Sequence, residues 1–180
     1  MPTTTTVRAV GPPGGPCVRD RIAHVRTRSR GTFRVVVIAL DEQLCFPLYA
    51  TSRAFTRAYA EVLAPFGLTY VQYLALLVLW EEGEVGVGRV GERLELDSGT
   101  LTPLLRRLQR DGWVTRTRDP EDERRVLVAL TDEGAALEAR VQDVPGRIRA
   151  ASGLDDGEVD ELKALLEQTL AALRDRTEEG

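Results

Sequence analysis

A leucine repeat with helical spacing that passes directly into two short β-type segments constrains the fold of this chain most. Four leucines lie on one face of a helix predicted over residues 98–111: Leu101, Leu104, Leu105 and Leu108. Gly112 is placed to end that helix in the C-cap position. Residues 113–118 and 125–130 alternate in β-forming side chains, and a polar turn at 119–123 joins them into a hairpin.

Further helices are predicted on both sides of this unit. Apolar spacing and caps predict them over these ranges: 41–64 (regular from about 45–47), 70–82, 87–94, 131–144 and 156–174. A loop is expected at 83–88, a turn at 95–97, and an interruption at Pro145-Gly146. The expected fold is mainly α with a small β-hairpin wing, a winged helix-turn-helix that dimerises through its N- and C-terminal helices.

The domain organisation follows from composition. Residues 1–40 are rich in Thr, Gly, Pro and Arg and are expected to form a disordered tail. Residues 41–177 are expected to form one domain. Within it, the DNA-binding part is expected at about 68–130, and the dimerisation helices at about 41–64 and 131–177. An apolar face on residues 156–174, with too many leucines for one terminal helix to hide, favours a homodimer.

The composition excludes several classes of protein. The longest apolar stretch, near residues 74–80, is far shorter than the roughly 18 residues of a membrane span. No apolar segment follows a basic start, so no signal peptide is expected and the expected location is the cytoplasm, without a membrane partner. The single histidine, His24, lies in the tail, so no histidine-based catalytic group or metal cluster is expected in the folded part. Neither an enzyme nor a bound metal or cofactor is predicted.

A basic strip in an acidic chain favours double-stranded DNA as the partner. The net charge of the chain is −4, yet residues 106–125 hold seven arginines and five acidic residues. The helix predicted over 98–111 exposes groups suited to base edges and phosphates: Ser98, Thr100, Thr102, Arg106 and Arg107. The hairpin adds Arg118, Arg124 and Arg125. The alternative is a small helical domain with a basic surface.

Four segments resemble the organic hydroperoxide resistance regulators, a branch of the MarR family of transcriptional regulators. Residues 44–53 (LCFPLYATSR) resemble their first helix, and residues 68–81 (LTYVQYLALLVLWE) match them as well. Residues 96–116 (LDSGTLTPLLRRLQRDGWVTR) are similar to the recognition helix and first wing strand, and residues 119–134 (DPEDERRVLVALTDEG) to the wing. The likeness covers about residues 41–175. It implies a dimeric repressor that binds an inverted-repeat operator and is released by an organic hydroperoxide, derepressing hydroperoxide-detoxification genes.

The resemblance also implies roles for individual residues. Cys45 matches the family's redox-sensing cysteine, and Tyr59 and Tyr70 match tyrosines that hydrogen-bond the sulfur from the partner subunit. Tyr49, one turn beyond Cys45, is a further candidate that rearranges on oxidation. From the residues alone, a thiol at a helix start meets backbone N–H groups that favour the reactive thiolate, whereas most free cysteines are small buried hydrophobes.

The resemblance extends to the chemistry of oxidation and to the wing. No cysteine follows Cys45, so the chain resembles the one-cysteine regulators, in which a small thiol caps the sulfenate or further oxidation is irreversible. Cys17, in the tail, is the only other thiol. Residues 122–124 match the D-x-R wing motif, which implies that Arg124 enters the minor groove while Asp122 orients its guanidinium.

Two other functions remain open at this point. One is a regulator of the same fold that responds to a reversibly bound phenolic or lipophilic ligand. The other is a thiol peroxidase that uses Cys45 and needs activating partners in an open pocket. Full response of a Cys45→Ser protein to its inducer would favour the first, and repeated turnover without DNA binding would favour the second.

Overall fold

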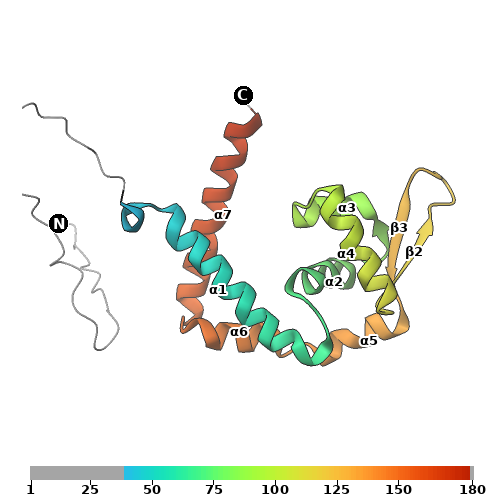
Figure 1. Cartoon of the computed structure of the whole chain (residues 1–180), viewed down its shortest axis with the longest axis horizontal. Helices are drawn as coiled ribbons and strands as arrows, with labels where there is room; N and C mark the ends of the chain where they lie inside the picture. Colours follow the sequence, from blue (N-terminus) through green and yellow to red (C-terminus); the bar gives the residue numbers. More distant parts are fainter. Residues whose placement is uncertain (1–38, 179–180) are drawn as a thin grey trace, which may run out of the picture. The chain divides into compact units, whose positions relative to one another are not determined.

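The computed structural model describes residues 39–178, and seven α-helices and three strands lie within that range (Figure 1). The elements follow in this order: η2 (Leu40–Glu42), α1 (Cys45–Leu63), η3 (Ala64–Phe66), α2 (Tyr70–Glu82), β1 (Val85–Gly86), α3 (Val87–Leu94), α4 (Ser98–Arg110), β2 (Val114–Arg118), β3 (Val126–Leu130), α5 (Asp132–Arg140), α6 (Val144–Ser152) and α7 (Asp156–Glu178). The predicted tail lies outside the described residues except for Ala39 and Leu40, and Cys17 lies outside them as well. The mainly helical fold with a β wing is confirmed.

The wing is part of a three-stranded antiparallel sheet with the order β1-β3-β2. The predicted hairpin of β2 and β3 is confirmed and pairs over five residues of each strand. The prediction of a plain loop over residues 83–88 is wrong, because Val85 pairs with Val128 of β3. The backbone immediately before α3 is therefore hydrogen-bonded to the wing.

The core is built from the helix-turn-helix elements and the sheet. The largest fully buried side chains are Leu63, Leu76, Leu79, Leu105, Leu108, Leu137, Val90, Val114, Val128 and Val144. The four leucines predicted to share one face of α4 are all buried, so the helical spacing of that segment is confirmed. The predicted boundaries of α2 and α3 agree with the structure residue for residue.

The structure confirms the predicted start of α4 at Ser98 and corrects its C-terminal end. The N-cap is Asp97, whose carboxylate accepts a hydrogen bond from the backbone N–H of Thr100 at 3.0 Å. The helix ends at Arg110, and the C-cap is Asp111 rather than Gly112. Gly112 follows with φ of +84°, a left-handed conformation that favours glycine because it has no Cβ.

The segment after the wing contains one more helix than predicted. The helix capped by Thr131 ends at Arg140 rather than near residue 144. Pro145 and Gly146 then lie inside α6, not between helices, since proline in a first turn has no intrahelical N–H bond to lose. The last helix begins at Asp156 as predicted and continues to Glu178.

The start of α5 packs tightly on the end of α4 and on α2. The Thr131 hydroxyl accepts from the N–H of Gly134 at 3.0 Å and donates to the carbonyl of Gly112 at 2.7 Å. The indole N–H of Trp80 donates to the carbonyl of Gly134 at 3.0 Å. A Cβ built on Gly134 would lie 2.0 Å from the carbonyl oxygen of Trp113, so this position accepts only glycine.

Large apolar side chains remain exposed on α1 and α7 of the single chain. On α7 they are Leu162, Leu165, Leu166, Leu170 and Leu173. The sequence predicts these leucines on an inward face, whereas in the single chain they remain exposed. In Figure 1 α1 crosses α7, and side chains of both helices line an apolar groove.

Among residues 39–178, no single helix is both long and apolar enough to cross a membrane. Only the bent pair formed by Cys45–Phe66 and Tyr70–Glu82, at 72°, meets that test by length and composition.

Candidate nucleic-acid interface and thiol site

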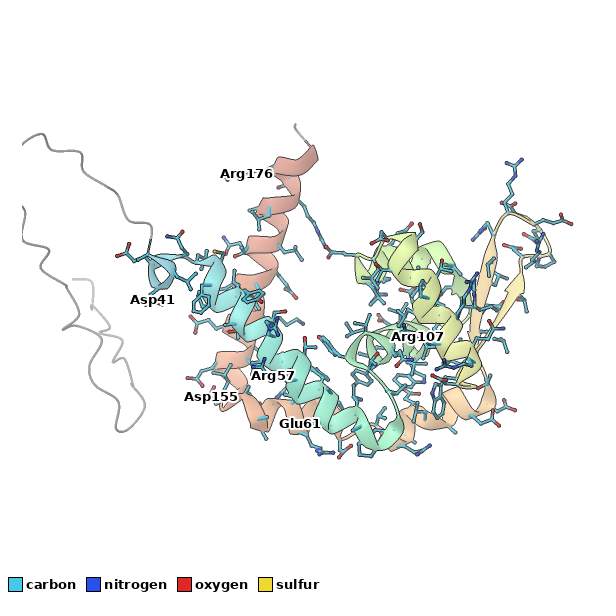
Figure 2. All side chains as sticks on the ribbon, viewed as in Figure 1. Asp41, Arg57, Glu61, Arg107, Asp155 and Arg176 are labelled. Atoms are coloured by element: carbon cyan, nitrogen blue, oxygen red, sulfur yellow. The ribbon has the colours of Figure 1, made fainter. Side chains whose placement is uncertain are left out.

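The exposed face of α4 carries the groups predicted to contact DNA. Arg106 and Arg107 are exposed on this helix, away from its buried leucines, and Figure 2 labels Arg107. Ser98 is also exposed at the first helical position. Thr100 differs from the expectation, because its hydroxyl donates to the Asp97 carboxylate at 3.0 Å and supports the N-cap.

The N-cap of α4 is an electrostatic feature in its own right. The backbone N–H and the hydroxyl of Thr100 hold the pKa of Asp97 below its usual range. Asp97 is therefore ionised at neutral pH and neutralises part of the positive end of the helix.

Thr102 is another of the hydroxyls predicted to contact DNA. It is half-buried and lies next to the wing.

The wing, α4 and the N-terminus of α3 enclose a basic cavity of about 610 Å³. Its polar lining consists of Arg89, Glu92, Thr102, Arg116, Arg124 and Arg125. The structure thus brings together three of the predicted DNA-contacting residues, Thr102, Arg124 and Arg125, whereas Arg118 lies at the exposed end of β2 and does not line the cavity. Positively charged arginine side chains at this place attract phosphate groups.

Arg116 is a residue that the sequence reasoning missed. Its Nε is buried and has no hydrogen-bond partner among the described residues, which leaves a donor available at the cavity. β2 alternates its faces, so Arg116 lies on the same face as the buried Val114. An arginine at a position where the alternation calls for an apolar side chain is the signal that would have identified it.

The turn of the wing is held by backbone and carboxylate contacts. The Asp122 carboxylate accepts from the backbone N–H of Arg124 at 3.0 Å, not from its guanidinium as the wing motif implies. The buried Asp119 accepts from the N–H of Glu121 at 2.9 Å and lies 3.6 Å from the Arg125 guanidinium. In this structure Asp122 therefore shapes the turn from which Arg124 projects.

Ion pairs fix α3 against α2 beneath the basic cavity. The Arg89 guanidinium donates to the Glu82 carboxylate at 2.9 Å, and Arg93 bridges Glu81, at 2.8 Å, and Glu82. Hydrogen bonds from Arg89 and then Arg93 hold the pKa of Glu82 below its usual range. Arg89 is thus paired with Glu82, and Arg125 with Asp119, whereas Arg116 and Arg124 line the cavity with no ion pair among those found in the described residues.

Cys45 is the first residue of α1 and is exposed. The N-cap residue Leu44 has no side chain able to cap the helix, and the first turn carries no acidic residue. Backbone N–H groups at a helix start favour an anion, so this position suits a thiolate. No other free thiol is found among residues 39–178.

The two tyrosines matched to the thiol lie together but far from it along the chain. The rings of Tyr59 and Tyr70 stack at 4.2 Å between centroids, and Tyr73 lies 6.0 Å from Tyr59. Burial raises the pKa of Tyr59, as does the charge of neighbouring Tyr70, and burial raises that of Tyr70. Both hydroxyls therefore stay protonated at neutral pH and are hydrogen-bond donors.

Helix geometry separates Cys45 from Tyr59 of the same chain. The two residues are fourteen positions apart on α1, which is about 21 Å along a helix that rises about 1.5 Å per residue. Tyr59 of one chain is therefore too distant to bond Cys45 of that chain. Tyr49 is one turn from Cys45, but its hydroxyl accepts from Arg53 at 3.0 Å, and the same guanidinium lies 5.6 Å from its ring.

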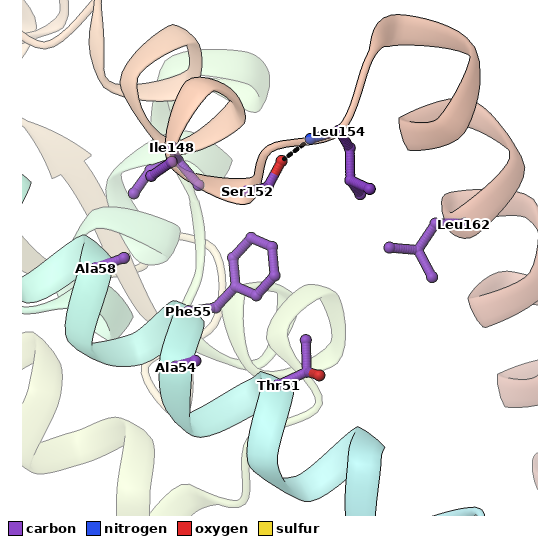
Figure 3. A pocket seen from close by; sticks show the side chains of 9 residues that line it. Thr51, Ala54, Phe55, Ala58, Ile148, Ser152, Leu154 and Leu162 are labelled. Atoms are coloured by element: carbon purple, nitrogen blue, oxygen red, sulfur yellow. Dashed lines mark hydrogen bonds between the residues drawn. The ribbon is translucent and has the colours of Figure 1, made fainter. Parts of the chain in front are cut away.

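Two apolar pockets run along α1 from the thiol. The first has a volume of about 710 Å³ and is lined by Leu44, Pro47, Leu48, Thr51, Ser52, Phe55, Tyr70, Leu162 and Leu166. The second, of about 300 Å³, lies between α1, α6 and α7, with Phe55 projecting into it (Figure 3). Lipophilic molecules fit such surfaces better than polar ones. Among the described residues, no cluster of metal-ligating side chains is present.

The sequence of the chain is similar to those of known transcriptional regulators. Residues 57–140 match the family model described as "Transcriptional regulator SarA/Rot". The chain is 46% identical over 137 residues to the organic hydroperoxide resistance transcriptional regulator of Bacillus subtilis (strain 168), covering 76% of this chain and 93% of that protein.

Solved structures of DNA-bound regulators are also similar to this chain. Reduced AbfR bound to DNA has a TM-score of 0.66 and 41% identity, covering 75% of this chain and 92% of that one, and overoxidised AbfR has also been solved bound to DNA. A variant of MarR from E. coli with operator DNA has a TM-score of 0.66 and 32% identity, covering 71% and 93%.

Proposed function

Because the chain belongs to the MarR family of winged helix-turn-helix transcriptional regulators, in the branch of the organic hydroperoxide resistance regulators, we propose that it is a repressor whose operator binding is controlled by oxidation of Cys45. It is a DNA-binding regulator and not an enzyme. The observation that carries the redox proposal is Cys45 itself, an exposed thiol on the first residue of α1 beside an apolar groove.

The proposed reaction is a two-electron oxidation of sulfur. The Cys45 thiolate attacks an oxygen of an organic hydroperoxide, the O–O bond breaks, and an alcohol leaves as a sulfenic acid forms. A low-molecular-weight thiol then condenses with the sulfenic acid to give a mixed disulfide and water. Capping by a small thiol is favoured over a disulfide to a second cysteine in the C-terminal half, because no cysteine follows Cys45 in the sequence. Leu44 and Leu48, which are near Cys45 in the sequence and line the groove, suit a lipophilic peroxide.

The proposed active species is a homodimer. Tyr59 lies about 21 Å along α1 from Cys45 of its own chain, so a second copy is the proposed source of this hydroxyl for the thiolate. The exposed leucines of α7 provide a surface for that copy. Two-fold symmetry also accounts for an inverted-repeat operator. Oxidation would then change the geometry between subunits and release the DNA.

We expect Cys45→Ser to bind operator DNA as tightly as the parent protein and to stay bound after treatment with cumene hydroperoxide. The parent should lose operator affinity on the order of 10- to 100-fold, because coupling between two sites has that size. A gel-shift titration with and without peroxide measures both proteins. Cys17→Ser is the matched control, since it removes the other thiol and should respond as the parent does.

Two outcomes bear on the mechanism. If Cys45→Ser releases the operator normally, oxidation of this thiol is not the signal. Restoration of binding by dithiothreitol, only when a small thiol was present during oxidation, would support capping as a mixed disulfide. Release that dithiothreitol never reverses would instead support further oxidation.

The groove beside α1 favours a second candidate function. Its volume of about 710 Å³ and apolar lining suit a reversibly bound phenolic or lipophilic inducer. Such a ligand would release the operator from Cys45→Ser as well as from the parent. The same variant therefore separates the two functions.

The wing and the basic cavity are proposed as the phosphate and minor-groove contacts. Arg124→Ala and Arg116→Ala should each weaken operator binding by about 1–3 kcal/mol and reduce the salt slope by about 1, because each removes a cation near phosphate. The melting temperature should change little, since Arg124 makes no ion pair in the described structure and surface changes have small effects. Arg147→Ala on α6, another exposed arginine, is the matched control. Operator affinity of Arg124→Ala equal to that of the parent at several salt concentrations would remove the wing from the interface.

A further inference from the structure

A proline occupies the interior of α4 at an exposed position. Pro103 is the sixth residue of this helix and is exposed to solvent. Proline has no N–H to donate to the carbonyl of Gly99, and an interior proline costs a helix about 3 kcal/mol relative to alanine. Because the ring is not part of the core, no packing within the chain offsets this cost. The position therefore requires an explanation outside the stability of the chain.

The position of Pro103 on the helix supplies that explanation. Residues with spacings of three, four and seven share one face of a helix. The line through the middle of the exposed face, directly opposite the buried leucines, consists of Gly99, Pro103, Arg106 and Arg110. Ser98 and Thr102 lie toward its edge, and the Thr100 hydroxyl is bound to Asp97. The first contact that the middle of α4 offers to DNA is therefore an apolar ring, not a hydroxyl.

We propose that Pro103 is a specificity-determining residue that reads the C5-methyl group of a thymine in the major groove. The N-terminal residues of a recognition helix are those that meet base edges, and Pro103 lies in the N-terminal half of α4. A pyrrolidine ring has neither donor nor acceptor, so it reads no hydrogen-bond pattern. The thymine methyl is the apolar group that the major groove displays.

Gly99 supports this contact from the preceding turn. It has no side chain, so the backbone at this point stands closer to the groove than it does at any larger residue. A Cβ there would lie 3.0 Å from the Asp97 carboxylate oxygen that caps the helix. Gly99 thus preserves the cap and leaves the Pro103 ring as the most prominent apolar group on this turn.

The inference rests on the DNA interface proposed above, and its test separates the two. The probe is a duplex containing the inverted repeat that the parent binds, with thymines replaced by deoxyuridine one symmetric pair at a time. Deoxyuridine lacks only the C5-methyl group. At one pair the parent should lose about fourfold in affinity per half-site, which corresponds to one methyl group no longer buried.

Pro103→Gly should bind the thymine and deoxyuridine duplexes equally at that pair. The variant should fold, because glycine costs a helix less than proline, and its melting temperature should equal or exceed that of the parent. Pro145→Gly, in the first turn of α6, is the matched control and should keep the full preference for thymine.

The outcomes assign any failure to one of the two proposals. Two results would show that Pro103 reads no methyl group. In the first, Pro103→Gly keeps the parent's preference for thymine at every pair; in the second, the parent itself has no preference for thymine. Neither result would contradict the proposed DNA interface. If the parent binds no inverted repeat at all, the proposed interface itself is wrong.

Discussion

Gly134→Ala is expected to destabilise the protein by about 3 kcal/mol or more and to lower its melting temperature by on the order of 10 °C. The new Cβ would lie 2.0 Å from the carbonyl oxygen of Trp113 and 3.3 Å from a methyl of Leu130. The first of these is a backbone atom, so relief requires moving α5 away from the wing. That movement would also strain the hydrogen bond from Trp80 to the Gly134 carbonyl.

Gly146→Ala is the matched control for this substitution. Gly146 lies in α6, and a Cβ there would meet no atom within 4 Å. Alanine should stabilise that helix by about 0.5–1 kcal/mol because it reduces the conformational freedom of the unfolded chain. Thermal melts followed by circular dichroism at equal protein concentration compare the two variants. A melting temperature of Gly134→Ala within a few degrees of the parent would show that the contact with Trp113 relaxes easily.

Replacing Leu166 and Leu170 together by glutamate should convert the protein to monomers and reduce operator affinity more than 100-fold. Both leucines are exposed in the single chain and lie on the same face of α7. Two buried carboxylates per helix would make the proposed interface unfavourable, because unpaired charges lose their hydration there. A monomer has only one copy of α4, so it loses the affinity that is gained by contacting two half-sites at once.

The matched control adds the same charge to the other side of α7. Ala164 and Ala171 are also exposed and lie on the face opposite those two leucines. Ala164→Glu combined with Ala171→Glu should leave both mass and operator binding unchanged. Multi-angle light scattering at micromolar concentration gives the mass, and gel shifts give the affinity. A dimeric mass for the leucine variant would exclude this face of α7 from the interface.

Much of the fold is encoded in local sequence patterns. The bounds of α2 and α3 and the buried face of α4 follow from apolar spacing, because each helix buries one continuous stripe. The strand β1 was missed because two residues are too few to alternate. Val85 is a strand residue only through its pairing with Val128, more than forty positions later. Helix α6 was missed because Pro145 is a breaker in a helix interior but acceptable in a first turn.

The candidate site was harder to predict than the fold. The wing arginines and the exposed face of α4 were proposed from residue type and spacing, whereas the sensor role of Cys45 was proposed from the family resemblance, because a thiol at a helix start does not by itself distinguish a sensor from a small hydrophobe. Arg116 was not proposed, since its importance comes from a buried Nε that only the three-dimensional packing reveals. The leucines of α7 were expected to form an apolar face too large for one terminal helix to hide, and in the single chain they are exposed.

The short strand β1 has a mechanical consequence. It connects α2 to α3 without a flexible segment and is hydrogen-bonded to β3, so the wing has no hinge of its own. We therefore expect the wing and α4 to move together on DNA of different curvature, because β1 ties the backbone before α3 to β3. In a dimer, the quantity left to vary is the separation of two such units, which must match one turn of the double helix, about 34 Å. In the proposed dimer, a small rotation between subunits would change the fit at both half-sites simultaneously, so the proposed release would need no local unfolding.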